Sequence, residues 1–511
     1  MKKLTIILLV LSALLLNLLP ACDGLDDAYS TNPTYRLSFS RDTLTFDTIF
    51  TTIGSTTRQF MIYNKNNEPL NIESILLAGA ETTGFRMNVD GRKGNSFNNV
   101  GILANDSMHV FVEVTVNPNG TDQPLLLQDS VIFWVNGIRQ SVLLEAYGQD
   151  VNLYKGGVTI TKDSTLKADR PYLIYDSLVV AKGASLNIEK GVTFYLHDKA
   201  NIVVYGTINA LGTKDEPITF RGDRLDYILN DLLPYDRTPG QWGGIFFKTE
   251  SYGNVWDNVI VRNGTTGITC ELSTPDRPKL KINNSQITNM SQNLFSSINC
   301  DVSATNTEFS NAGGSVMTLI GGSYYFAHCT IANYMSLVKR ETAGEAAVDS
   351  KTLYLVHNAT VNKSGPYPII QAYFDNCIID GSNSPTDDFQ TGGEIEISSG
   401  KNFTRTDGIG PFNYRFNHCV LKAKETSGTP FKEVLFVTQS PHYKKAGGKE
   451  NKYAYDFRLD AVSAPGIGKA DPGITKVYPV DRYGINRLTS SNGPTIGAYE
   501  FVKEPEDNPN K

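Results

Sequence analysis

The 511-residue sequence is poor in cysteine, and its cysteines form no recognisable pair. There are six, none in a Cys-x-x-Cys motif, which excludes a disulfide scaffold and argues against zinc or thiol redox chemistry. The sequence also lacks a long basic run and has a net charge of -6, so it offers no electrostatic footprint for nucleic acid. With 40% apolar and 20% charged residues, the chain is globular and long enough for more than one domain.

The apolar segment that could enter a membrane lies at the beginning of the chain. It reads MKKLTIILLVLSALLLNLLPAC, with two lysines, an apolar stretch from Leu4 to Leu19, and Cys22 after a small residue. These features indicate an export signal rather than part of the fold. The segment resembles a bacterial lipoprotein signal, which implies that Cys22 becomes the acylated N-terminus and anchors the chain in a membrane. The alternative is an ordinary cleaved signal in which Cys22 is incidental.

A short acidic and polar stretch, DGLDDAYSTNPTY, follows Cys22 and predicts a tether. In enterobacteria, an Asp directly after the lipidated cysteine favours the inner membrane. In Bacteroidota, acidic residues close behind that cysteine resemble a surface-export signal. Because of the family resemblances below, we expect the outer membrane, with display at the cell surface.

From Tyr35 to Gly148 the sequence alternates apolar and polar residues in short runs, as in RQFMIYNKN and HVFVEVTV, with Gly, Asn and Asp at the breaks. This period of two predicts a small antiparallel β-sandwich. The order Gly54-Ser55, Tyr63-Asn64 and Pro69-Leu70-Asn71-Ile72 resembles Ig-like domains of the abnormal-spindle type over about 110 residues. The resemblance implies a spacer or adhesive module.

Beyond Val151 the strands become shorter, and one pattern recurs at spacings of about 22 residues or about twice that. Each copy has a core residue, then an Asn or His two residues later, a small residue next, and an aliphatic or aromatic residue two further on. Asn and His tolerate left-handed backbone, so their column predicts a bend repeated on successive coils. The pattern therefore predicts a parallel β-helix, right-handed as such crossovers nearly always are. The first column is Trp256, Ile282, Ala304, Phe326, Phe374 and Phe416, and the bend column is Asn258, Asn284, Asn306, His328, Asn376 and His418.

The same region contains GTINALGTKDEPITF, GQWGGI, HCTIAN, NCIIDG and DRYGINRLTSSNGPTIGAYEF. With these motifs it resembles the right-handed β-helix proteins of Bacteroidota that end in the "choice-of-anchor Q" pattern, over about 340 residues. The resemblance implies export and a stack of coils, but no single activity. We therefore expect an all-β protein with five parts: a signal peptide (1–21), an acidic tether (22–34), an Ig-like β-sandwich (35–150), the parallel β-helix (151–501) and a disordered tail (502–511).

One loop, RGDRLDYILNDLLPYDRTPGQWGGI, combines carboxylates, arginines and aromatic side chains. Carboxylates beside flat aromatic faces suit sugar rings, which present hydroxyl groups at their edges and C–H groups on their faces. The favoured interpretation is nevertheless structural, as a cap over the coils or a support for the sandwich, and ligand binding is the alternative. The candidate ligand-binding residues are Asp223, Tyr227, Asp231, Tyr235, Asp236 and Trp242.

No residues are identified as catalytic. Glycosidases need two carboxylates at a defined separation, and the loop offers several without defining a pair. Lyases of the pectate-lyase type use carboxylate-bound calcium with a basic residue, but Asp387-Asp388 and the lysines of HYKKAGGKENKY lie in separate loops. His328-Cys329 and His418-Cys419 are possible ligand types, but neighbours around a bend point in different directions. We therefore expect no metal and no cofactor.

The sequence thus predicts a lipid-anchored protein of the outer membrane that binds a glycan or another envelope protein without catalysis. The alternative is a carbohydrate-active enzyme of the β-helix kind, either a polysaccharide lyase or a glycoside hydrolase. A third possibility is an accessory subunit of an outer-membrane complex.

Overall fold

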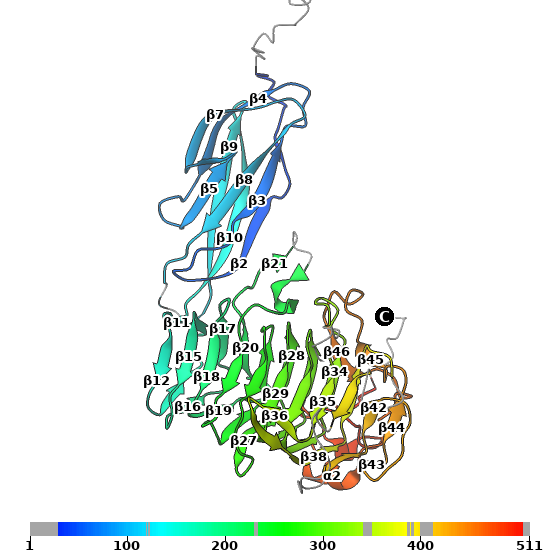
Figure 1. The fold of residues 1–511 in the computed structure, drawn as a ribbon. Helices are drawn as coiled ribbons and strands as arrows, with labels where there is room; N and C mark the ends of the chain where they lie inside the picture. Colours follow the sequence, from blue (N-terminus) through cyan, green and yellow to red (C-terminus); the bar gives the residue numbers. More distant parts are fainter. Residues whose placement is uncertain are drawn as a thin grey trace, which may run out of the picture. The chain divides into compact units, whose positions relative to one another are not determined.

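The structure is a computed structural model that describes residues 29–118, 120, 123–228, 233–340, 350–385, 389, 393–398 and 412–503. The expected signal peptide, Cys22, Asp231, Asp387-Asp388 and most of the expected tail lie outside these residues. The chain divides into two compact units, Met1–Asp150 and Val151–Lys511. The expected all-β fold, a β-sandwich followed by a parallel β-helix, is confirmed (Figure 1).

The first unit is a sandwich of two five-stranded sheets. Buried and more exposed residues alternate along the longer strands, as in Ser107–Val114, because one face of each sheet packs on the shared core. The pairings are antiparallel except for β10 with β2. One sheet contains β1 (Ser38–Phe39), β3 (Arg58–Tyr63), β8 (Ser107–Val114), β5 (Phe85–Val89) and β6 (Arg92–Lys93). The other contains β2 (Thr43–Phe50), β10 (Ile138–Gln149), β9 (Leu125–Val135), β4 (Leu70–Leu77) and β7 (Ser96–Ile102).

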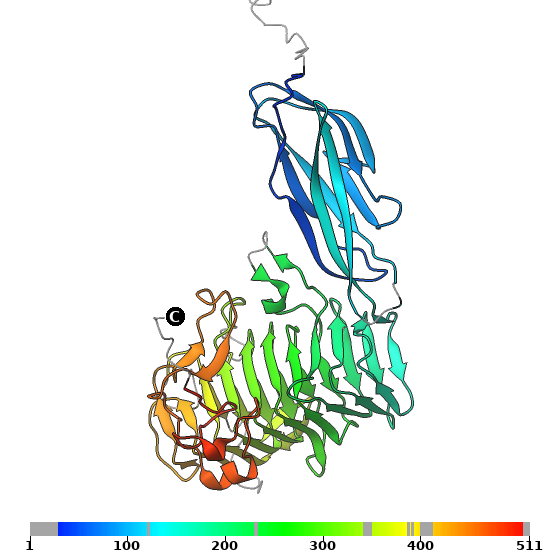
Figure 2. The ribbon, with the colours of Figure 1, turned by 180° about the vertical axis from the view of Figure 1, so that it is seen from behind.

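The second unit winds through three parallel sheets, here called sheets 1, 2 and 3 in the order in which the chain visits them (Figures 1 and 2). Sheet 1 contains β11 (Asn152–Tyr154), β14 (Tyr172–Ile174), β17 (Thr193–Leu196), β20 (Ile218–Gly222), β25 (Val259–Arg262), β28 (Gln286–Met290), β31 (Glu308–Ala312), β34 (Thr330–Asn333), β39 (Ile378–Gly381), β42 (Val420–Lys422) and β44 (Leu435–Val437). Sheet 2 contains β12 (Val158–Ile160), β15 (Ser177–Val180), β18 (Asn201–Val204), β23 (Ile245–Phe247), β26 (Ile268–Cys270), β29 (Phe295–Ile298), β32 (Met317–Ile320), β35 (Leu353–Val356) and β40 (Ile395–Ser398). Sheet 3 contains β13 (Ser164–Leu166), β16 (Ser185–Ile188), β19 (Thr207–Leu211), β24 (Asn254–Asp257), β27 (Pro278–Asn283), β30 (Asp301–Thr305), β33 (Gly322–Ala327), β38 (Ile369–Asp375), β41 (Tyr414–Asn417) and β43 (Phe431–Lys432).

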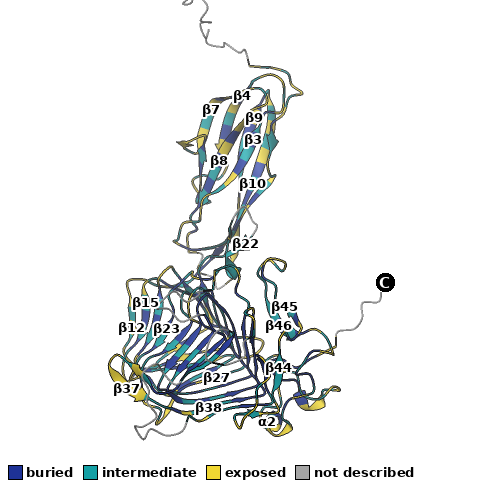
Figure 3. Ribbon diagram, turned by 45° about the vertical axis from the view of Figure 1, so that its right-hand side comes forward, coloured by how far each residue is buried: buried dark blue, intermediate teal, exposed yellow. Residues whose placement is uncertain are grey.

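Short elements lie outside the three sheets. They are the strand pairs β21 (Tyr227–Ile228) with β22 (Leu233–Pro234), β36 (Ala359–Val361) with β37 (Ser364–Tyr367), and β45 (Tyr443–Lys445) with β46 (Asp456–Leu459), together with η1 (Tyr235–Arg237), α2 (Pro472–Val477) and η2 (Arg487–Thr489). Figure 3 shows buried residues concentrated on the strands of the solenoid, and exposed residues around β37 and α2.

The predicted bend column is confirmed at the corner between sheets 3 and 1. Asn258, Asn284, Asn306, His328, Asn376 and His418 all have left-handed backbone, with φ between +48° and +53°. The predicted first column is confirmed as well, because its six members pair in register from coil to coil. The Asn and His side chains occur here because these residues adopt left-handed backbone at lower cost than most.

Stacked side chains fill the interior. The rings of Phe220 and Trp256 stack with centroids 5.7 Å apart, and those of Phe326 and Phe374 with centroids 5.1 Å apart. In the small-residue column, Cys377 donates its thiol to the carbonyl of Phe326 on the preceding coil at 3.5 Å. Burial raises the pKa of the Cys377 thiol well above its ordinary value, so it acts as an apolar core residue.

The C-terminal segment, residues 465–501, lies along the same corner and over the outer face of sheet 1. Arg487 is fully buried there and donates to Asn306 Oδ1 at 3.2 Å and to the carbonyl of Gly497 at 3.0 Å. His328 Nε2 lies 3.3 Å from the Thr475 hydroxyl. Side chains of the bend column thus bond to the C-terminal segment, in addition to forming the bends of the coils.

Candidate functional site

The loop singled out in the sequence connects β20 in sheet 1 to β23 in sheet 2. It contains the antiparallel pair of β21 and β22, followed by the 3-10 helix η1. Asp231 lies outside the described residues, so the structure places five of the six candidate residues.

Each described carboxylate of this loop lies close to a basic side chain of the same chain. Asp223 Oδ2 lies 2.7 Å from Nδ1 of His197. Arg224 makes a bidentate contact with Asp226, at 2.7 and 2.6 Å. Oδ1 of Asp236 lies 3.0 Å from guanidinium nitrogens of two arginines, Arg221 and Arg262, as ion pairs without hydrogen-bond geometry.

Burial shifts the acid–base behaviour of two groups in this loop. It raises the pKa of Asp223, although the hydrogen bond from His197 opposes that shift. Burial lowers the pKa of Arg262, although the charge of Asp236 opposes it. The described loop therefore presents no free pair of carboxylates of the kind that glycosidic bond cleavage requires.

The aromatic side chains of the loop differ in exposure. Trp242 is fully buried in the solenoid core and donates Nε1–H to the carbonyl of Arg262 at 2.9 Å, so its faces are closed to a ligand. The guanidinium of Arg224 lies over the Tyr235 ring, 4.0 Å from its centroid. Tyr227 is 42% exposed and is the side chain of the three that presents its ring to solvent.

Two further Asn side chains, Asn263 and Asn289, hold this loop against the coils. Asn263 and Asn289 have left-handed backbone at the corner between sheets 1 and 2. Asn263 donates to the carbonyl of Asp236 at 2.9 Å, and Asn289 donates to that of Arg237 at 3.0 Å. Arg237 in turn donates to the carbonyl of Lys452 at 3.0 Å. These contacts favour the structural role that the sequence left open for this loop.

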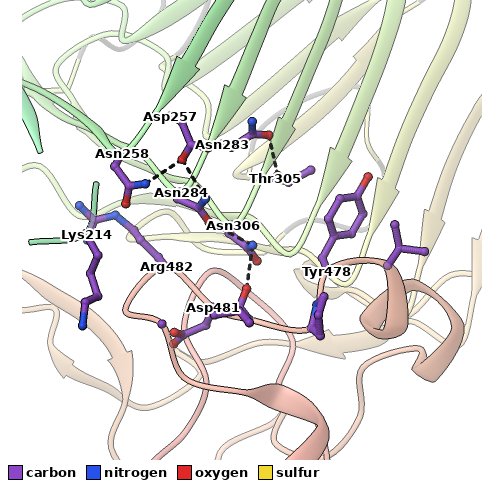
Figure 4. Close-up of a pocket in the computed structure, with 14 residues that line it drawn as sticks. Lys214, Asp257, Asn258, Asn283, Asn284, Thr305, Asn306, Tyr478, Asp481 and Arg482 are labelled. Carbon is purple, nitrogen blue, oxygen red and sulfur yellow. Dashed lines mark hydrogen bonds between the residues drawn. The ribbon is translucent and has the colours of Figure 1, made fainter. Parts of the chain in front are cut away.

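A pocket of about 420 Å³ that the sequence did not predict lies at the corner between sheets 3 and 1 (Figure 4). Its floor is formed by side chains just before and at the bend, including Asp257, Asn284 and Thr305, and its wall is formed by residues 477–482 of the C-terminal segment. Asp257 Oδ1 accepts from Nδ2 of Asn258 at 2.8 Å and from Nδ2 of Asn284 at 2.9 Å. A sequence signal existed, because a polar residue precedes the bend position in several coils.

A buried charge network lies on the outer face of sheet 1. Asp380 accepts from the Tyr334 hydroxyl at 2.5 Å and lies 3.9 Å from Nζ of Lys422. Nearby, Arg340 makes a bidentate contact with the buried Glu394, at 2.9 Å for both bonds. Burial raises the pKa of Asp380 to about 7, Glu394 adds to the shift, and the Tyr334 hydrogen bond and the Lys422 charge oppose it. Oδ1 of Asp380 has no hydrogen bond.

Within the described residues, no three His, Cys, Asp or Glu side chains gather as metal ligands. Burial lowers the pKa of His328 well below its ordinary value, so its ring is neutral. The described part of the chain also has no helix long and apolar enough to cross a membrane.

No protein-family model matches the chain. A stretch of 104 residues is 34% identical to the protein bark beetle of Drosophila melanogaster, a match that covers 19% of this chain and 3% of that protein. The chain therefore spans only a small part of this curated relative, and the match assigns no family.

Three solved structures are similar over about a quarter of the chain. The ASH / PapD-like domain of human CEP192 has 9% identity and a TM-score of 0.16, over 25% of this chain and 95% of that one. A protein of unknown function from Porphyromonas gingivalis W83 has 13% identity and a TM-score of 0.17, over 26% and 60%. A family 123 glycoside hydrolase from Clostridium perfringens has 7% identity and a TM-score of 0.17, over 24% and 30%. These scores support no statement about function.

The first prediction concerns the ion pairs of Asp236. The Asp236→Ala variant leaves Arg221 and Arg262 facing each other without a counter-charge. We expect it to lower the free energy of unfolding by about 1 to 2 kcal/mol, because the side chains are only partly buried and solvent screens part of the effect. Thermal and denaturant unfolding measure this change. Asp215→Ala, at a side chain that is 85% exposed, is the matched control, and equal melting of both variants would contradict a structural role.

The second prediction concerns the pH dependence of stability. The pKa of Asp380 rises from 3.8 to about 7 on folding, so the folded state holds a proton that the unfolded state releases between these values. The contribution of Asp380 to the free energy of unfolding is therefore fully present below about pH 4 and is lost as the pH rises through 7. Between pH 5 and pH 8, we expect the melting temperature of the Asp380→Asn variant to fall by less than that of the native chain. The Asp215→Asn control should keep the native slope, and parallel slopes for all three proteins would disprove the assignment.

Proposed function

We propose that this chain is a lipoprotein of the outer membrane, anchored through Cys22 and displayed at the cell surface. In this proposal the β-sandwich is an Ig-like spacer, and the β-helix belongs with exported solenoids that end in the choice-of-anchor Q pattern. The solenoid binds a glycan or another envelope protein without catalysis.

The observation that most supports a non-catalytic role is the internal pairing of the loop between β20 and β23. Asp226 and Asp236 are paired with arginines of the same chain, and Asp223 contacts His197. Trp242 is buried in the core. Acid–base catalysis needs carboxyl groups that can exchange protons with a substrate. Carboxylates held by arginines instead give a rigid surface, which suits binding.

The location of the protein is tested at the cysteine after the apolar segment. Because several acyl chains on one residue anchor a protein firmly, we expect the Cys22→Ser variant to leave the membrane fraction or to remain unprocessed. Detergent-phase partitioning of native and variant chains measures this. Cys419→Ser, at a buried thiol of the solenoid, is the control for cysteine substitution itself. Unchanged partitioning of Cys22→Ser would rule out acylation at this residue.

The binding role is tested with a panel of soluble polysaccharides and the purified full chain in detergent. For each polysaccharide, bound material and released product are both measured. We expect saturable binding without product. Release of unsaturated or reducing ends would instead favour a polysaccharide lyase or a glycoside hydrolase, and absence of binding would leave an envelope protein as the partner.

A further inference from the structure

The outer face of sheet 3 presents two rows of side chains that run from coil to coil in strict register. Between the two rows, the core residues of the first column point inward. The outer row is Val255, Lys281, Ser303, Tyr325, Tyr373 and Arg415. The corner row, next to the bends, is Asp257, Asn283, Thr305, Ala327, Asp375 and Asn417.

The C-terminal segment covers only one end of the corner row. Thr305, Ala327, Asp375 and Asn417 are buried. Asn417 donates to Asp471 at 3.1 Å at the start of α2. Toward the earlier coils, Asp257 and Asn283 are partly exposed, and they form the floor of the pocket in Figure 4. The pocket therefore lies where the corner row is partly exposed, at Asp257 and Asn283, before the C-terminal segment covers the row.

The floor offers donors and acceptors side by side. Asn283 accepts from the Thr305 hydroxyl at 2.9 Å through Oδ1, which leaves its Nδ2 without a partner among the described residues. Oδ2 of Asp257 likewise has no hydrogen bond from the described chain, since both amides bond to Oδ1. Lys281 is exposed on the neighbouring row, and Lys214 stands at the rim of the pocket. Paired donors and acceptors of this kind match vicinal hydroxyl groups, which both donate and accept.

One aromatic ring lines the pocket, and two others lie on the outer row of sheet 3. Tyr478 lines the pocket from the C-terminal segment (Figure 4). The Tyr325 side chain lies within hydrogen-bonding reach of the Tyr478 hydroxyl. On the next rung, the guanidinium of Arg415 lies over the Tyr373 ring, 4.2 Å from its centroid. The surface thus places flat faces beside polar edges.

We infer that the corner groove, defined as Asp257, Lys281, Asn283, Thr305, Tyr325 and Tyr478, binds an oligosaccharide. This inference rests on the proposed binding function and assigns it to the corner groove instead of the loop between β20 and β23. Successive rungs of a β-helix are about 4.8 Å apart, so repeated polar side chains meet a repeating chain of sugar rings at similar intervals. A pocket of about 420 Å³ is large enough for a small number of such rings.

The experiment compares three forms of the purified full chain with dextran, xylan and polygalacturonate as probes. The groove variant is Lys281→Ala with Tyr325→Ala. The matched control is Lys182→Ala with Tyr205→Ala, which removes an exposed lysine and a 38% exposed tyrosine at the corner between sheets 2 and 3. We expect the native chain and the control to bind at least one probe equally. The groove variant should bind it about tenfold more weakly or worse, with a melting temperature close to that of the control.

The outcomes separate this inference from the proposed function. Native binding that survives in the groove variant overturns the corner groove while the binding function stands. Loss of that binding in a Tyr227→Ala variant would then assign the site to the loop between β20 and β23. Failure of the native chain to bind any probe overturns the inference and the glycan branch of the proposed function. If the groove variant does not fold, Asp257→Asn, which keeps an acceptor for the two neighbouring amides, gives the same comparison.

Discussion

The left-handed backbone at the corner between sheets 3 and 1 is the constraint on which the solenoid depends. At each of the six predicted positions, a single residue with φ within a few degrees of +50° turns the chain from sheet 3 to sheet 1. Most residues pay a steric penalty for this conformation, whereas Asn and His pay less. Because the bend occurs at the same position in each of these coils, equivalent residues on successive coils point into the core. The Phe326 ring therefore stacks on the Phe374 ring, and the Cys377 thiol bonds to the carbonyl of Phe326 on the preceding coil.

The same bend residues determine the chemistry of the surface. Their amide and imidazole groups project at the corner, where the C-terminal segment uses some of them as anchors. Asn306 accepts from Arg487, and His328 meets Thr475, so the last part of the chain is held by side chains selected for the bend. Where that cover ends, Asn258 and Asn284 bond to Asp257 and form the polar floor of the pocket. Fold and candidate site therefore share one physical cause.

The β-helix could be predicted because its left-handed bends require particular residue types, Asn or His, and these recur at a regular spacing. The role of the loop between β20 and β23 could not be predicted, because its carboxylates contact side chains such as Arg262 and His197, which the fold brings together across coils. Trp242 was expected at a binding surface but lies in the core, since a strand-edge aromatic and a loop aromatic look alike in sequence. The pocket was missed because its two sides, near Asp257 and Tyr478, lie far apart in the chain.

In the described residues, the carboxyl group with a strongly raised pKa and the carboxyl group exposed at the pocket are different residues. A catalytic acid needs a raised pKa together with access to the substrate. Asp380 has the raised pKa, but it is fully buried against Tyr334 and Lys422. Asp257 is partly exposed at the pocket, and both neighbouring amides donate to Oδ1 of its carboxylate. The raised pKa and the exposure thus occur at different residues. Oδ2 of Asp257, which has no hydrogen bond from the described residues, can accept from a hydroxyl group, as the inferred corner groove requires.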